Sequence, residues 1–292
     1  LAAAAAVGEQ AGAREATGVR GATEIATTPE AEPEPRKSKT ALIAAAASPS
    51  TGVAQEAAGD AAALAKAAQN PVAELISLPF QNNTDFGLEP GNKAKNVLNV
   101  QPVVPVGLGS KVNLIVRTII PIVSMPKEVY GEDGGRLNGL GDIALSLFLT
   151  PAKPGKLIWG VGPAMTFPTA TDPKLGAQKW AAGPSIIALI QPKGWTFGAL
   201  AQNTWSYAGD PDRGDVNFFY SQVFITRNLP KGWYVNTAPI ITANWEAASG
   251  QQWLVPLGAG VGKLFRIGKQ PFNAQAGYYN FIIAPDNGPD WE

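Results

Sequence analysis

From about residue 75 onward, the chain alternates between apolar and polar positions. The clearest example is residues 195–207, where one face consists of Trp195, Phe197, Ala199, Ala201, Asn203, Trp205 and Tyr207. Ten residues separate Trp195 from Trp205. At ~3.3 Å per residue and a ~40° tilt they span about 25 Å, the height of the apolar band on an outer-membrane barrel. The pattern predicts a strand that crosses a membrane with aromatic rings at both interfaces.

Similar faces recur in later segments of the chain. The predicted aromatic girdle comprises Trp159, Phe167, Trp195, Trp205, Tyr207, Trp233, Trp245 and Trp253. The opposite faces carry small or polar residues such as Gly160 and Thr196, which are too small to fill an interior and predict a wet lumen or an internal plug. Residues 216–227 spread aromatic side chains over both faces, so their orientation stays open.

Short and long connections alternate between these segments. Short turns are expected at 107–110, 152–156, 191–194, 229–232 and 267–271, and longer polar loops at 86–95, 125–141, 168–179, 208–215, 246–251 and 285–290. Outer-membrane barrels have short periplasmic turns and longer external loops. The fold class predicted is therefore all-β, an antiparallel up-and-down transmembrane barrel. About eleven strands are counted and such barrels have even numbers, so Trp291 and Glu292 are expected to begin a twelfth that is missing from this chain.

The first 70 residues differ from the rest. All 25 aromatic residues lie at or after Phe80, so residues 1–70 are interpreted as a low-complexity segment that is disordered or derived from a signal, and 71–292 as the barrel. Leu1–Val7 resembles the tail of a secretion signal, and the basic run 36–39 followed by Ala41–Ala47 is a second candidate. Plain low complexity is the alternative to both. Residues 53–68 are Ala-rich and predict a short helix ending before Asn70-Pro71.

Composition excludes several functions. The chain has no His and no Cys, which removes Ser-His-Asp triads, thiolate nucleophiles and His- or Cys-ligated metal sites. No catalytic residue, cofactor or metal site is therefore predicted. Net charge is zero with 16% charged residues, so no nucleic-acid partner is expected. No apolar stretch approaches the ~18 residues that a membrane helix needs.

Arg117 is the first candidate for the lumen, since it lies on the face opposite Val112, Leu114 and Val116, and a charge facing lipid costs roughly 2–4 kcal/mol. We expect it to pair with a lumen carboxylate, while selection of a solute is the alternative. Asp142 is either that partner or a turn residue, and turn duty is favoured. The other predicted lumen residues are Gln202, Asn236 and Asn244.

The loop with Asp210, Asp212, Arg213 and Asp215 clusters carboxylates that could ligate Ca²⁺. Its spacing lacks the glycine and terminal glutamate of an EF-hand, so no metal site is assigned there.

Four runs carry a resemblance to a known family: Gln69–Asn83, Lys153–Pro163, Phe167–Thr171 and Ala238–Glu246. From about residue 70 the chain resembles the outer-membrane proteins grouped as meta-pathway phenol-degradation proteins, some of which are mislabelled neuromedin U. The resemblance implies an outer-membrane barrel concerned with uptake of small, often aromatic, compounds. It implies no catalysed reaction and no particular site residues.

The sequence thus predicts a channel or uptake protein of the bacterial outer membrane, with membrane lipid and a small-molecule solute as partners. A soluble ligand-binding barrel and a plugged or structural barrel are the alternatives, and an enzyme is disfavoured because no carboxylate or Ser-Lys pair stands at a useful spacing. The sequence leaves the solute and the oligomeric state open.

Overall fold

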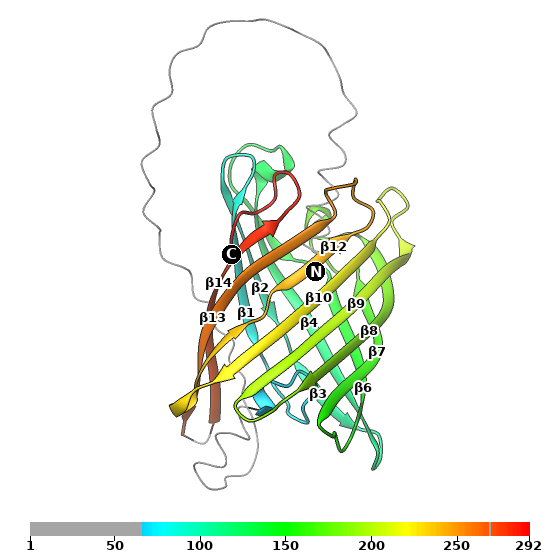
Figure 1. Cartoon of the computed structure of the whole chain (residues 1–292). Coiled ribbons are helices and arrows are strands. Elements are labelled where there is room, and N and C mark those ends of the chain that lie inside the picture. The colour runs from blue at the N-terminus through cyan, green and yellow to red at the C-terminus, as the bar shows by residue number, and fades with distance from the viewer. Residues whose placement is uncertain (1–65, 269) are drawn as a thin grey trace, which may run out of the picture.

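The computed structural model describes residues 66–268 and 270–292, which form one antiparallel sheet curled into a tilted barrel (Figure 1). This confirms the predicted barrel. The strands are β1 (Phe80–Leu88), β2 (Lys93–Val100), β3 (Val103–Gly107), β4 (Val112–Pro126), β5 (Arg136–Leu140), β6 (Ile143–Pro151), β7 (Leu157–Phe167), β8 (Lys179–Ile190), β9 (Trp195–Gly209), β10 (Asn217–Asn228), β11 (Trp233–Thr237), β12 (Ile240–Asn244), β13 (Trp253–Ile267) and β14 (Gln270–Ile283). Short 3-10 helices occupy Lys127–Tyr130, Pro173–Leu175 and Pro230–Gly232.

Three crossings of the wall are each made of two labelled strands. β2 and β3 pair with successive parts of β4, β5 and β6 also pair with β4, and β11 and β12 both lie between β10 and β13. The fourteen labelled strands therefore make eleven crossings, the number that the sequence predicts.

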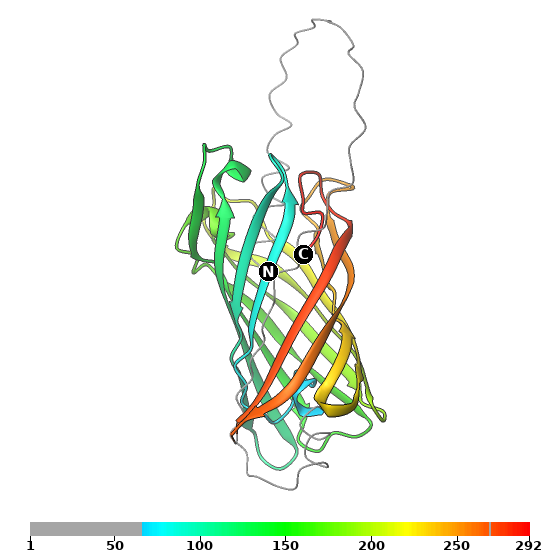
Figure 2. The same cartoon turned by 90° about the vertical axis from the view of Figure 1, so that its left-hand side faces the viewer.

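The last residues lie between the first and last strands. Trp291 forms bridges with Phe86 of β1 and Asn280 of β14, and its ring stacks on Phe86 with centroids 3.9 Å apart. Trp291 and Glu292 therefore occupy the place of a strand between β14 and β1 (Figure 2). In residues 66–268 and 270–292, β1 otherwise pairs with β2 and β14 with β13.

Short and long connections lie at opposite ends of the barrel, as predicted (Figures 1 and 2). Two expected loops are shorter than predicted: β1 and β2 extend into 86–95 and leave only residues 89–92, and β5 forms within 125–141 by pairing with the end of β4. By the rule for outer-membrane barrels, the short-turn end is the periplasmic end. The other end is called the loop end below.

Helical structure is confined to short turns in the described residues. No helix in this part of the chain is long and apolar enough to cross a membrane. Both signal candidates, and most of the helix predicted over residues 53–68, lie outside the described residues. Of that predicted helix, the structure describes Lys66–Ala68, which form a helical turn.

One expectation about the interior is wrong. The inward faces of β3, β4, β6, β8, β9 and β10 are not uniformly small and polar. They contribute an apolar core made of Val103, Ile115, Phe148, Ile187, Leu189, Leu200, Phe218 and Tyr220, joined by Val72. Glycine and amide positions suggest an unfilled interior, but these large residues alternate with them on the inward faces and fill one side of it. The core also settles the orientation of β10: Phe218 and Tyr220 point inward, while Val223 and Ile225 are exposed outside.

Candidate lumen site

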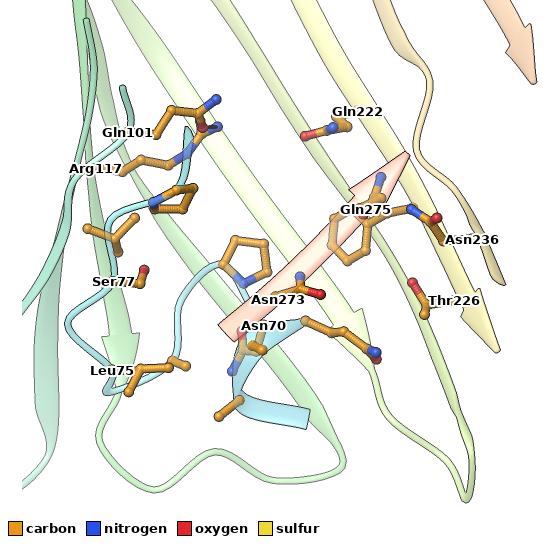
Figure 3. A pocket seen from close by; sticks show the side chains of 18 of the residues that line it. Asn70, Leu75, Ser77, Gln101, Arg117, Gln222, Thr226, Asn236, Asn273 and Gln275 are labelled. Carbon is orange, nitrogen blue, oxygen red and sulfur yellow. Dashed lines mark hydrogen bonds between the residues drawn. The ribbon is translucent and has the colours of Figure 1, made fainter. Parts of the chain in front are cut away.

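The segment of residues 66–79, called the plug, lies within the periplasmic end of the barrel (Figures 2 and 3). Side chains from three crossings hold it. Gln69 exchanges hydrogen bonds with Asn228 (2.7 and 3.2 Å) and accepts one from Thr196 Oγ1 (2.9 Å). Farther along, the Asn113 amide donates to Glu74. Each bond joins the plug to the barrel wall.

The plug is anchored at its end by backbone pairing and by burial. Ser77 and Val103 exchange two backbone hydrogen bonds of 3.1 and 2.9 Å, so the segment enters the sheet just before β1 begins. Val72 is 4% exposed and packs into the interior core. The plug therefore obstructs the periplasmic mouth and completes the packing on one side of the lumen.

Three adjoining cavities occupy the rest of the lumen. The first, of about 220 Å³, lies between the plug and the wall and is drawn in Figure 3. It shares Gln222, Asn236 and Gln275 with a second of about 180 Å³, and Gln101 and Arg117 with a third of about 100 Å³. Since a dry cavity of ~150 Å³ admits benzene, the first two are each large enough for one aromatic ring.

Arg117 projects into this space from β4. Its Nη2 donates to Gln101 Oε1 (2.9 Å), and the guanidinium also contacts the Tyr220 hydroxyl. The expected lumen carboxylate is absent: none of the ion pairs among the described residues includes Arg117. A counter-charge is not required here, because neutral acceptors on Gln101 and Tyr220 bind the guanidinium beside the cavities. Its role in selecting a solute stays a prediction.

The three predicted amides lie in different surroundings. Asn236 faces the first and second cavities. Gln202 is buried, and its Oε1 accepts from Ser146 and Ser185 (3.4 and 3.5 Å), so it belongs to the packed side of the lumen. Asn244 lies at the loop end, where its side chain accepts from Glu246 N (3.1 Å) and shapes a turn. Of the predicted set, the structure brings only Arg117 and Asn236 to a common cavity.

Two buried amide oxygens at the second cavity have no donor. Among the described residues, Asn83 Oδ1 and Asn236 Oδ1 make no hydrogen bond, and Asn236 is 9% exposed. A buried acceptor without a donor costs about 1–3 kcal/mol, so these atoms suit a ligand or water that donates. Asn83 was not singled out from the sequence, although its alternation with Gln81 and Asp85 places it on one face.

The structure also contains a buried ion pair that was not predicted from the sequence. Lys95 Nζ lies 2.6 Å from Asp85 Oδ2, and the two residues are direct cross-strand partners on β1 and β2 at the third cavity. Both are less than 10% exposed. The signal that could have found them is the alternation of charged and polar residues in 83–85 and 93–95, which places these charges on one inward face.

Asp142 is not the partner of Arg117, and instead of closing the turn that enters its own strand it binds a neighbouring loop. Its carboxylate accepts from the backbone N–H groups of Ala170 and Ala177 (3.1 and 2.8 Å) and so fastens the loop between β7 and β8. In the loop that clusters Asp210, Asp212 and Asp215, the carboxylates of Asp210 and Asp215 accept hydrogen bonds from Asp212 N and Ser206 Oγ (2.9 and 3.1 Å).

Two loops pack against the wall and against each other at the loop end. Leu175 is fully buried against Leu88, Val97, Val123 and Met125. Tyr130 donates to the Lys174 carbonyl at 2.5 Å, and burial raises the pKa of Tyr130 to about 12. Its hydroxyl therefore stays protonated and able to donate throughout the physiological pH range.

The outer surface is apolar between two groups of aromatic residues. Trp159, Trp195 and Trp233 lie near the periplasmic turns, whereas Phe167, Trp205, Tyr207, Trp245 and Trp253 lie toward the loop end. Between them, large apolar side chains such as Ile186 and Leu257 are more than half exposed. A soluble barrel has no reason to expose such a band, whereas a wall in contact with hydrocarbon requires one.

Comparison with known proteins bears on the fold. The structure is similar to the crystal structure of the COG4313 outer membrane channel from Pseudomonas putida F1, with a TM-score of 0.53 and 17% sequence identity over 89% of this chain and 96% of that chain. This similarity shows that the chain has an outer-membrane β-barrel fold. No family model matches the sequence. No curated protein matches it either.

Proposed function

We propose that this chain is a channel or uptake protein of the bacterial outer membrane for small compounds with an aromatic or apolar body. The observation that carries the proposal is the series of adjoining cavities inside the barrel, which are lined by amides, Arg117 and aromatic side chains. The solved structure with the same fold is named an outer membrane channel, and the four runs that resemble the meta-pathway phenol-degradation proteins point the same way.

The lining favours a neutral solute with one hydrogen-bonding group. Phe224 and Tyr234 offer apolar surface at the first cavity, while the unpartnered oxygens of Asn83 and Asn236 accept from a hydroxyl at the second. A phenol presents both features, a ring and a donor. We assign no catalysed reaction, since a chain without His or Cys can form neither a Ser-His-Asp triad nor a thiolate nucleophile.

Replacing Asn236 with Leu is expected to slow phenol uptake about two- to tenfold and to leave toluene uptake unchanged. The variant removes one acceptor, and a hydrogen bond contributes roughly 0.5–1.5 kcal/mol net. Initial rates of uptake of the two labelled solutes, by cells that produce each variant at equal levels in the outer membrane, measure the effect. Asn236→Gln, which keeps an amide, is the control. An equal loss for both solutes would show that Asn236 supports the wall and does not select the solute.

The plug favours a second candidate, a barrel that is permanently closed and structural. In that case the rates of uptake would be the same in cells with and without the protein.

A further inference from the structure

The charged residues of the barrel are divided between its two ends. The short periplasmic connections that the structure describes in full all contain lysine and contain neither Asp nor Glu. They span residues 108–111, 152–156, 191–194 and 229–232. Each of the longer connections at the loop end contains at least one carboxylate. Glu74 also lies toward the periplasmic end, but it belongs to the plug and accepts a hydrogen bond from Asn113. The periplasmic rim of the wall is therefore basic.

Two further cations of this end lie within strands, on the outer surface. Arg227 shares a face of β10 with the exposed Ile225. Lys263 shares a face of β13 with the exposed Val261. Because alternate residues of a strand point to the same side, both side chains leave the wall on its lipid-facing side. A charge is costly in hydrocarbon, so each charged group has to lie at the level of the lipid headgroups.

Each of these cations lies over a girdle tryptophan. The Arg227 guanidinium carbon is 5.0 Å from the centroid of the Trp195 ring. Lys263 Nζ is 4.9 Å from the centroid of the Trp233 ring. A cation–π contact positions the cation but uses no lone pair, so the N–H groups keep their capacity to donate. Arg227 gives one long hydrogen bond, of 3.5 Å, to the Gly194 carbonyl.

The two cation–tryptophan pairs are neighbours on the wall. Arg227 lies opposite Val235 of β11. Lys263 lies opposite Trp233, which precedes Val235 by two positions on the same strand. Since adjacent strands are ~4.8 Å apart, the two cations are separated by about 10 Å across the sheet, with β11 between them. Among the residues that the structure describes, neither cation takes part in an ion pair. Both long side chains can therefore reach one anion in front of β11.

Two lysines border this place on its water side. The turn that leads into Trp195 carries Lys193, and the turn that leads into Trp233 carries Lys231. Both lysines are exposed. Their charges attract a headgroup that is negative overall and repel one that carries an ammonium group of its own. The surroundings of Arg227 and Lys263 therefore select by the net charge of the headgroup.

We infer that Arg227 and Lys263, each held over its tryptophan, bind the phosphate of one anionic phospholipid in the periplasmic leaflet of the outer membrane. The phosphate oxygens accept from the guanidinium and the ammonium, and the acyl chains lie along exposed apolar side chains such as Val261. An acidic periplasmic protein fits the turn lysines, but it does not fit cations that share a face with the apolar band. The bound lipid fixes the depth of the barrel in the bilayer, whichever solute the barrel admits.

Lipid binding by the purified full chain tests the site. The chain in detergent is titrated with phosphatidylglycerol and with phosphatidylcholine of the same acyl chains, and native mass spectrometry measures the bound fraction of each. Phosphatidylglycerol should bind several-fold more tightly. Arg227→Gln and Lys263→Gln should each weaken its binding about fivefold, the effect of one cation on an anionic lipid, and should change phosphatidylcholine binding little. Arg227→Lys with Lys263→Arg keeps both charges and should keep the preference.

The matched control is Lys153→Gln with Lys156→Gln, which removes two charges from the same end of the barrel. These lysines precede Trp159, a girdle tryptophan with no cation over its ring among the described residues. The control should keep the preference for phosphatidylglycerol. An equal loss in the control and in Arg227→Gln with Lys263→Gln would overturn the site and show a diffuse attraction to the basic rim. Equal binding of the two lipids by the unmodified chain would also overturn it, and would make an acidic periplasmic protein the better partner for this end.

Discussion

Deleting residues 66–75 from the chain is expected to raise its single-channel conductance several-fold. This part of the plug carries Gln69, Val72 and Glu74, which bind three crossings of the wall at the periplasmic end. Without it the first cavity opens toward the periplasm. The cost to stability should be modest, because the main loss is burial of Val72, worth about 1.5–3 kcal/mol.

Planar-bilayer recordings of the deletion and of the full chain make this comparison. A deletion of residues 56–65, equal in length but leaving the plug in place, is the control. The opened channel should prefer anions mildly, since Arg117 has no carboxylate partner among the described residues, and Arg117→Gln in the same deletion should abolish that preference. Equal conductance of the deletion and the full chain would show that the plug does not limit the pore.

Phe148→Ala is expected to lower the free energy of unfolding by about 3–5 kcal/mol. Phe148 is fully buried inside the barrel against Ile115, Ile187 and Leu189, so truncation leaves a cavity in a packed interior. Denaturant titrations of the folded fraction in detergent micelles, followed by the shift of the folded band on unheated gels, give the difference.

The control is the same substitution on the outer surface. Phe265 is 38% exposed and stacks on Phe272 with centroids 5.8 Å apart, so Phe265→Ala should cost only about 1 kcal/mol. Equal losses for the two variants would contradict the assignment of Phe148 to an interior core.

The wall was predictable because its signals are local. Alternation with a period of two places Trp195 and Trp205 on one face, and Pro and Gly mark the turns, so strand number and the outer aromatic residues follow from the sequence. An internal plug was one of two predicted states of the lumen, but the segment that forms it was not predictable. Gln69 and Thr196 are 127 positions apart, and no local pattern indicates that they meet. The hydrogen bond between Arg117 and Gln101 was not predictable for the same reason, because only the pairing of the strands brings the two residues together.

The prolines within the strands gain a physical account from the structure. Pro102 separates β2 from β3, and Pro239 separates β11 from β12. Pro163 lies opposite Pro184 where β7 meets β8, beside the short interruptions on either side. Sequence alone marks them as breaks. It cannot show which breaks adjoin a cavity, because that depends on how the other side of the lumen is filled.

The most direct test of the account is the rate at which cells take up labelled phenol and toluene at low concentration, compared between a strain that produces this chain and the same strain without it. The account predicts faster uptake of both solutes in cells with the chain in their outer membrane, and no change for a charged disaccharide too large for the cavities. If each solute enters the two strains at the same rate, the result contradicts the proposed function, and a closed, structural barrel is the better interpretation.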